Sequence, residues 1–204
     1  MDFDLYGISE ELLEKLSYES KIGKSLKNTL RKFDKENLIN EILDIKEFYE
    51  STELLRDVRF SYRIKSLQSC ILKYNKYYPS TEVNKCYNDL LGIRVRVEEY
   101  KEILAMNLDS FRIADMTNGK VNDDGYRGIH LYYQKNNRNY PIEIQVNSKE
   151  DRKFNDWLHI HLYKHTKNNG VGIILREKYD NNEIKSEEDF KEVLKNVLSS
   201  CKEV

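Results

Sequence analysis

Two short runs of alternating apolar residues carry polar side chains that could do chemistry. In residues 122–146, NDDGYRGIHLYYQKNNRNYPIEIQV, His130 lies between two apolar positions, and Glu143 and Gln145 alternate with isoleucine and valine. Successive side chains of a strand point to opposite faces. The pattern therefore predicts a hairpin with one apolar face and one face that gathers an imidazole, a carboxylate and an amide. A sheet with one side in water would show the same alternation.

A second carboxylate precedes another alternating run. In residues 88–97, NDLLGIRVRV, Asp89 stands just before a predicted strand whose apolar residues alternate with Arg94 and Arg96. An aspartate at the start of a strand is well placed to hold a cation, and it is equally common as a turn former.

Cationic residues gather upstream of Asp89, in residues 63–73, RIKSLQSCILK. Ser69 and Lys73 are four residues apart and would share one face of a helix, as on an ordinary basic helix surface. The glycine-rich loop with which many enzymes bind phosphates, GxxxxGK, does not occur in the sequence. If the chain binds phosphates, side chains such as Arg63 and Lys65 would have to hold them.

The elements that must position these residues follow from periodicity. Ser9 precedes a helical pattern, a second one follows at residues 37–55, and the first 56 residues read as all-helical. The later expectations, in chain order, are a helix over 59–78, a strand over 90–97, a helix over 98–107, a strand over 110–117, the hairpin, a helix over 148–166, a looser segment over 168–185 and a helix over 186–200.

Composition limits the class of protein. The 204 residues contain 34 Lys and Arg against 35 Asp and Glu, so the net charge of −1 gives no global attraction to nucleic acid or to an anionic membrane. No run approaches the ~20 apolar residues of a membrane span. The three cysteines, Cys70, Cys86 and Cys201, form no metal-binding pair and are expected to be free thiols in a reducing cytoplasm.

Five separated segments together resemble one known family. In chain order, RIKSLQSCILK, DLLGIRV, DGYRGIHL, IEIQV and LHIHLYK resemble the synthetase domain of the RelA/SpoT family, the alarmone synthetases. These enzymes move pyrophosphate from ATP to the 3′ hydroxyl of GTP or GDP. The resemblance covers roughly residues 58–165. It implies a nucleotidyltransferase-like mixed β-sheet flanked by helices, in an α+β fold.

The resemblance also implies a role for each matching residue. Asp89 matches the magnesium-binding aspartate, and Glu143 matches a catalytic glutamate that binds metal or activates the acceptor hydroxyl. Both would hold Mg²⁺, which is usually bound by one or two carboxylates plus substrate phosphates. The implied ATP-binding residues are Arg63, Lys65, Ser69 and Lys73. The implied GTP-binding residues are Tyr126, which would stack on guanine, with His130 and Gln145.

The same resemblance implies an organisation along the chain. We expect an N-terminal helical extension over residues 1–56, a synthetase domain over 57–166 and a C-terminal extension ending in a helix over 167–204. The chain then resembles a small, single-domain alarmone synthetase, a type that commonly forms homotetramers. Leu38, Ile42 and Ile45 recur at helical spacing and suit either an oligomer interface or packing within the chain.

Three positions depart from the family pattern. Asp123 and Asp124 stand where the family often has lysine or asparagine, and Asn147 stands where it often has arginine. These departures favour one alternative, a catalytically inactive nucleotide-binding regulator. A second alternative is a toxic relative that pyrophosphorylates the 3′ end of tRNA with the same residues, which a basic surface would favour.

Overall fold

The computed structural model describes residues 3–166 and 168–200. The chain divides into two compact units that alternate along the sequence. Unit 1 comprises residues 1–95, 101–113 and 130–145, and unit 2 comprises residues 96–100, 114–129 and 146–204, each as far as it is described. Within the described ranges, no helix is long and apolar enough to cross a membrane.

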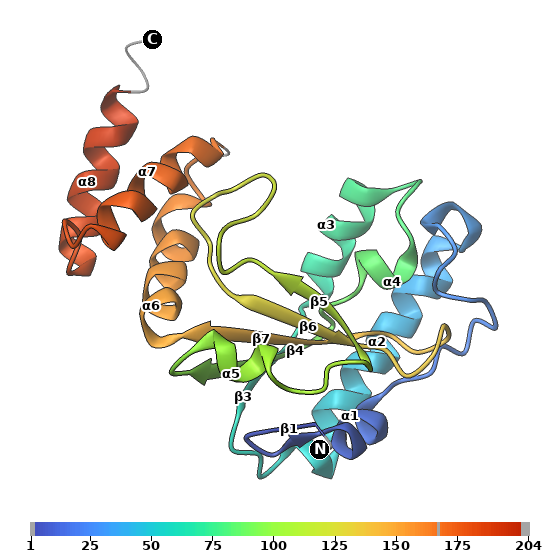
Figure 1. The fold of residues 1–204 in the computed structure, drawn as a ribbon. Helices are drawn as coiled ribbons and strands as arrows, with labels where there is room; N and C mark the ends of the chain where they lie inside the picture. Colours follow the sequence, from blue (N-terminus) through green and yellow to red (C-terminus); the bar gives the residue numbers. More distant parts are fainter. Residues whose placement is uncertain (1–2, 167, 201–204) are drawn as a thin grey trace. The chain divides into compact units, whose positions relative to one another are not determined.

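A mixed sheet of five strands runs in the order β3-β4-β7-β6-β5 (Figure 1). Its strands are β3 (Ser61–Ile64), β4 (Leu91–Val97), β5 (Phe111–Asp115), β6 (Ile129–Tyr133) and β7 (Ile142–Ser148). The expected α+β class, with a mixed sheet and helices on either side of it in sequence, is confirmed. Leu131, Ile142 and Ile144 are completely buried, as the alternation of the hairpin predicts.

β3 was not expected, because residues 59–78 read as one helix. It pairs antiparallel with β4, with Arg63 opposite Gly92 and Ile64 opposite Leu91. α3 (Leu67–Tyr77) begins only after Ser66, whose hydroxyl accepts from the backbone N–H of Ser69. A four-residue edge strand is too short for periodicity to separate it from a helix.

The expectation that residues 1–56 are all-helical is wrong at the start of the chain. A small hairpin, β1 (Asp4–Leu5) and β2 (Ile8–Ser9), turns at Tyr6 and Gly7, whose φ values are 55° and 89°. Both turn residues are in the left-handed region that suits tight hairpins. The helical elements that follow are α1 (Glu10–Leu16), the 3₁₀ turn η1 (Leu30–Lys32), α2 (Lys35–Ser51) and the 3₁₀ turn η2 (Glu53–Leu55).

The apolar face of α2 faces the interior of unit 1. Leu38, Ile42 and Ile45 have exposed fractions of 2% or less. Of the two possibilities left open by their spacing, packing within the chain is therefore the one observed. These side chains do not form a surface for association, so the expected homotetramer depends on the family resemblance alone.

Two short helices complete this part of the chain, α4 (Val83–Cys86) and α5 (Tyr100–Leu104). Cys70 on α3 and Cys86 on α4 are buried free thiols, as expected. Burial raises the pKa of each to about 11, so neither is a reactive thiolate at neutral pH. Cys201 lies outside the described residues.

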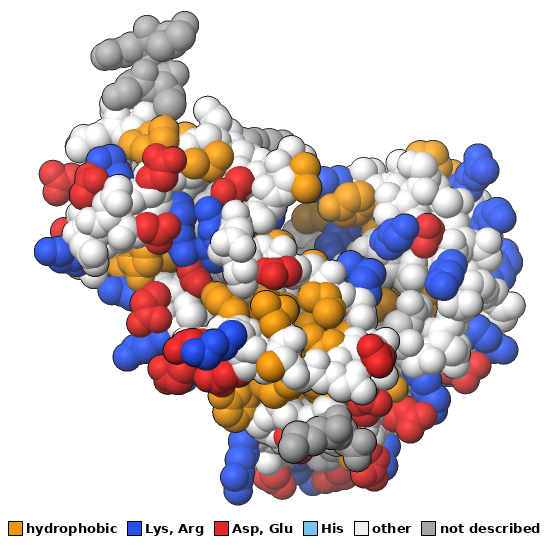
Figure 2. All heavy atoms as spheres, viewed as in Figure 1, with side chains coloured by type: hydrophobic (Ala, Val, Ile, Leu, Met, Phe, Trp, Pro, Cys, Tyr) orange, Lys and Arg blue, Asp and Glu red, His pale blue; other side chains and the backbone are white. Residues whose placement is uncertain are grey.

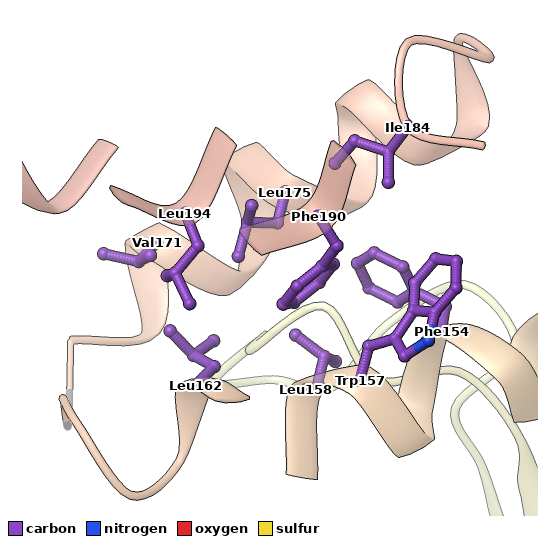
Figure 3. Packing of buried hydrophobic residues seen from close by; sticks show 9 residues of the cluster. All are labelled: Phe154, Trp157, Leu158, Leu162, Val171, Leu175, Ile184, Phe190 and Leu194. Carbon is purple, nitrogen blue, oxygen red and sulfur yellow. The ribbon is translucent and has the colours of Figure 1, made fainter. Parts of the chain in front are cut away.

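The helices of unit 2 enclose a separate apolar cluster (Figure 3). They are α6 (Lys149–Trp157), the π-helical turn η3 (Leu158–Leu162), α7 (Asn169–Asp180) and α8 (Glu187–Ser200). Aromatic side chains of α6 and α8 meet at its centre, where the ring centroids of Phe154 and Phe190 lie 5.7 Å apart. This cluster gives the unit its own core.

α7 corrects a further expectation, because residues 168–185 read as a looser segment. Gly170 and Gly172 weaken the helical pattern, since glycine is a poor helix former. The helix forms nevertheless because Asn168 caps its first turn, with Oδ1 accepting from Gly170 N at 3.0 Å, and because Val171 and Leu175 are buried in the cluster. Tertiary packing thus overrides local propensity.

Candidate active site

Two lysines converge on Asp89, just before β4 in unit 1. Nζ of Lys65, which follows β3, lies 2.6 Å from Oδ2 of Asp89. Nζ of Lys73, on α3, lies 2.8 Å from Oδ1. A backbone hydrogen bond of 2.9 Å from Lys65 N to Leu90 O holds the end of β3 beside this segment. Each carboxylate oxygen of Asp89 therefore has its own ammonium partner.

The charge state of Asp89 follows from these contacts. Burial alone would raise its pKa, but the charges of Lys73 and Lys65, and the hydrogen bonds from both, outweigh burial and hold the pKa of Asp89 below its usual value. Asp89 is therefore ionised at neutral pH. Its lysines are cations on flexible stems, which could exchange the carboxylate for the oxygens of a phosphate chain.

Glu143, on β7, is a second buried carboxylate and has an exposed fraction of 5%. Nδ1 of His130, on neighbouring β6, lies 3.1 Å from Oε1, and Nε2 of Gln145 donates to Oε2 at 2.7 Å. Burial opposes ionisation, but His130, followed by Gln145, holds the pKa of Glu143 below its usual value.

Two further residues of this polar face were not singled out from the sequence. The Tyr132 hydroxyl lies 3.3 Å from Nδ1 of His130. Burial and the nearby charge of Glu143 raise the pKa of Tyr132, so the phenol keeps its proton. The Arg112 guanidinium, on β5, lies 3.9 Å from the Tyr132 ring centroid. Alternation along β6 does place Tyr132 on the face of His130, which was the available signal.

The two carboxylates lie near one another. The charge of Asp89 raises the pKa of Glu143, opposing the other groups around it. The backbone of β4 passes beside β7 at Gly92, where an added Cβ atom would lie 3.6 Å from Oε2 of Glu143, an ordinary van der Waals contact.

This donor set fits a magnesium ion bound together with a nucleotide. In the described part of the chain, no group of three or more His, Cys, Asp and Glu could hold a metal ion by itself. Mg²⁺ seldom requires such a cage, since it commonly uses one or two carboxylates and completes its shell with water and substrate phosphates. Asp89 and Glu143 are two ionised carboxylates, and each could supply such a ligand.

The other two residues implied in ATP binding lie close to the same elements. Ser69 is in the first turn of α3, and its hydroxyl lies 2.9 Å from that of Ser66. Its spacing from Lys73 falls within one helix, as predicted. Arg63 is an exposed residue of the edge strand β3, opposite Gly92 in the pairing with β4.

Tyr126 belongs to unit 2, whereas His130 and Gln145 belong to unit 1, and each is described within its own unit. Tyr126 lies in the loop between β5 and β6. The Lys120 ammonium lies 4.6 Å from its ring centroid, and Nδ2 of Asn147 donates to its hydroxyl at 3.3 Å. The backbone N–H of Tyr126 donates to Oδ1 of Asp124 at 3.2 Å.

A comparison with models of protein families identifies the family of the chain. The model of a region found in RelA and SpoT proteins matches residues 62–168, which is more than half of the sequence. The chain therefore belongs to the RelA/SpoT family. No curated protein sequence matches it.

Solved structures of small alarmone synthetases are among those similar to the chain. Small alarmone synthetase 1 from Bacillus subtilis bound to its product pppGpp is 16% identical, with a TM-score of 0.46, over 81% of this chain and 91% of that one. The same enzyme bound to AMPCPP is 17% identical, with a TM-score of 0.39, over 83% and 92%. A GTP pyrophosphokinase family protein from Streptococcus pneumoniae is 18% identical, with a TM-score of 0.41, over 82% and 89%. At these values, membership of the family rests on the family model.

Proposed function

We propose that the chain is a GTP/GDP pyrophosphokinase, which transfers the β,γ-pyrophosphate of ATP to the 3′ hydroxyl of a guanine nucleotide. The observation that carries the proposal is the arrangement around β4 and β7, where the ionised Asp89 pairs with two lysines and its charge acts on a second ionised carboxylate, Glu143, in a RelA/SpoT region. Transfer of a phosphoryl-type group depends mostly on positioning and on neutralising the phosphate charge. This site contains groups for both tasks.

Lys65 and Lys73 would bind the phosphates of ATP. Both now lie within 2.8 Å of Asp89, and their Nζ atoms can move to phosphate oxygens without a change in the strands. Arg63 and Ser69 lie on the adjoining β3 and α3, where they would extend this cationic and hydroxyl-bearing surface.

Asp89 and Glu143 would hold Mg²⁺. When bound, the ion neutralises crowded phosphate oxygens and orients the transferred group. Contacts from His130 and Gln145 fix the orientation of the Glu143 carboxylate. A carboxylate held in this way does not need to reorganise when substrate arrives, which favours the transition state.

The acceptor would use Tyr126 as a platform for guanine, with His130 and Gln145 contributing polar contacts. In the reaction, the acceptor's 3′ oxygen forms a bond to the β-phosphorus of ATP. The bond from that phosphorus to the oxygen bridging the α-phosphate breaks, and AMP leaves. The hydroxyl proton is lost to a base, a role for which Glu143 is the candidate. Such a reaction draws on cytoplasmic nucleotides, and we further propose a cytoplasmic homotetramer by analogy with the family.

A basic segment supports a second candidate, an enzyme that acts on the 3′ end of tRNA. Residues 21–35 contain six Lys and Arg and one acid, Asp34, in a chain whose net charge is −1. All six basic residues are exposed. Figure 2 shows Lys and Arg side chains along the side of unit 1 that carries this segment together with α3 and α4. Such a surface suits a phosphate backbone.

One assay separates these functions. Purified protein is incubated with labelled ATP and Mg²⁺, and with GTP, GDP, GMP or bulk tRNA, and the products are resolved. The main proposal expects label transfer to GTP or GDP. Transfer to tRNA alone, falling steeply as salt is raised, would establish the second candidate. Transfer to none of these acceptors would leave the inactive regulator and contradict both enzymatic proposals.

A further inference from the structure

Three residues depart from the family pattern, and all three belong to unit 2. Asp123 and Asp124 lie in the loop that carries Tyr126, and Asn147 contacts this loop. Acids so close to a nucleotide site would repel its phosphates if their charges were unbalanced. The contacts of each residue show instead that the charges are balanced and that the groups are used to hold the loop.

Asp123 closes the loop on itself. Its Oδ1 and Oδ2 accept hydrogen bonds from Nη1 and Nη2 of Arg127 at 2.8 and 3.0 Å. Oδ1 also accepts from the backbone N–H of Gly125 at 3.0 Å. Burial opposes the charge, but the Arg127 guanidinium and the Gly125 N–H outweigh it and lower the pKa of Asp123. A two-point pair between planar groups fixes orientation as well as distance.

Asp124 connects Lys120 to Tyr126. Nζ of Lys120 lies 2.9 Å from each oxygen of Asp124, and the same carboxylate accepts from the backbone N–H of Tyr126. This arrangement brings the Lys120 ammonium over the Tyr126 ring. The cation therefore lies against one face of the ring.

Asn147 holds the far end of the loop. Its side chain has an exposed fraction of 2%, and Nδ2 donates to the carbonyl of Arg127 at 2.9 Å and to the Tyr126 hydroxyl at 3.3 Å. An arginine here would be too large for the same pair of short contacts. The amide thus fixes both the backbone after Tyr126 and the end of its side chain.

The backbone of the loop also packs closely against α7. Gly125 has a φ of 85°, and a Cβ at Gly172 would lie 2.0 Å from the carbonyl oxygen of Asp124. Only glycine at position 172 allows the loop to approach α7 this closely. The side-chain contacts and the backbone contact therefore support the same loop conformation.

We propose that Asp123, Asp124 and Asn147 are positioning residues that hold Tyr126 and Lys120 ready for the guanine nucleotide acceptor. The proposal rests on the proposed function, which assigns the acceptor to Tyr126, and it adds which residues set the acceptor's affinity. An aromatic platform already held in place loses less conformational freedom when a base stacks on it, so binding is tighter. The departures from the family pattern are then adaptations of an acceptor site rather than signs of its loss.

The principal test is Asp124→Asn, which keeps the side-chain volume and removes the charge that holds Lys120. We expect the acceptor KM to rise about ten- to hundredfold, the size of a lost charged hydrogen bond, while kcat and the KM for ATP change less than twofold. Asp124→Glu, which keeps the charge, should recover part of the acceptor affinity. Asp156→Asn is the matched control, because Asp156 is an acid of unit 2 that pairs only with Arg152 in the structure's described contacts. It should match the parental protein.

Binding of a fluorescent GDP analogue gives a readout that needs no turnover. Asp124→Asn and Asn147→Ala should both weaken it, with melting temperatures high enough that each variant is folded during the measurement. Unchanged analogue binding and acceptor KM in folded Asp124→Asn would overturn the proposal and leave the proposed function intact. Parental protein that binds the analogue but transfers no pyrophosphate would contradict the proposed function alone. Parental protein that does not bind it would overturn both.

Discussion

The two units position their polar groups in different ways. In unit 1, Glu143, His130 and Tyr132 alternate with buried apolar residues on two strands, so the sheet itself determines where they point. In unit 2, Tyr126 lies on a loop whose conformation depends on hydrogen bonds from side chains and on contact with α7. We therefore expect the groups on the strands to be affected mainly by substitution of the groups themselves. We expect Tyr126 to be affected also by substitution of the residues that hold its loop.

The largest effect should come from the carboxylate with the two lysines. Asp89→Asn keeps the volume of the side chain and removes a metal-binding charge, so we expect turnover to fall more than a hundredfold. Losing one preorganised electrostatic contact typically costs roughly 3 kcal/mol in the transition state, and losing a metal site costs more. Turnover at saturating Mg²⁺, with far-UV circular dichroism to confirm folding, measures this. Exposed Asp109→Asn is a suitable control.

Glu143→Gln should lower turnover by a similar factor. It replaces a carboxylate, which contacts His130 and accepts from Gln145, by a neutral amide with only one acceptor oxygen. Turnover and thermal stability should be measured together. If this variant and Asp89→Asn both retain near-parental turnover at saturating Mg²⁺, the active site has been assigned to the wrong residues.

Tyr126→Ala tests the loop-borne side of the comparison. Stacking of a base on an aromatic ring contributes about 1 to 3 kcal/mol, so its loss should raise the half-saturating concentration of the acceptor roughly five- to hundredfold. The affinity for ATP should change much less. Tyr126→Phe keeps the ring and loses the weak contact of the hydroxyl with Asn147, so its effect should be mild. Steady-state titrations of both substrates decide the matter. A selective defect in ATP use, with normal acceptor saturation, would refute the assignment.

Gly172→Ala changes only a support of the loop. The added methyl group would collide with backbone, so we expect about a three- to tenfold rise in acceptor KM and a lower melting temperature, even though alanine is the better helix former by about 1 kcal/mol. Gly170→Ala, where the new Cβ would meet only the Asn168 side chain at 3.2 Å, is the control in the same helix. Equal effects at the two glycines would remove the special role of the contact at position 172.

The smallest effect concerns acid stability. The pKa values of Asp89 and Glu143 are held below the usual 3.8 and 4.5 in the folded chain, so their contribution is complete above these values and is lost as pH falls through the lower folded values. Urea unfolding between pH 5 and pH 3 should show parental stability falling more steeply than that of Asp89→Asn, by on the order of 1 kcal/mol. A steeper loss in the variant would show that the lysine pairs do not stabilise the ionised carboxylate.

The parts of the fold that sequence predicts are those with a clear period. β4, β6, β7 and α8 have strong alternation or helical spacing and lie where expected. β3, the β1–β2 turn and α7 were missed, because they depend on a strand partner, on left-handed turn residues and on packing around two glycines. Periodicity within a segment does not contain this information.

The candidate site divides in the same way. Alternation alone put His130, Glu143 and Gln145 on one face, and the structure brings them into contact. Only the family resemblance put Lys65, Lys73 and Asp89 in one site. The three residues follow β3, lie on α3 and precede β4, respectively, so tertiary packing brings them together. The links from Asp123, Asp124 and Asn147 to Tyr126 could not be predicted, because a loop's conformation is set by contacts between residues as distant as positions 124 and 172.

The most direct test of the account is the identity and stoichiometry of the products. Parental protein is incubated with ATP, Mg²⁺ and GDP, and the nucleotides are followed by ³¹P NMR and mass spectrometry. We predict that AMP and a guanine nucleotide carrying a 3′ pyrophosphate appear in equal amounts, and that neither appears with Asp89→Asn. Formation of ADP and inorganic phosphate irrespective of GDP, or the same products from the variant, would contradict pyrophosphate transfer at this site.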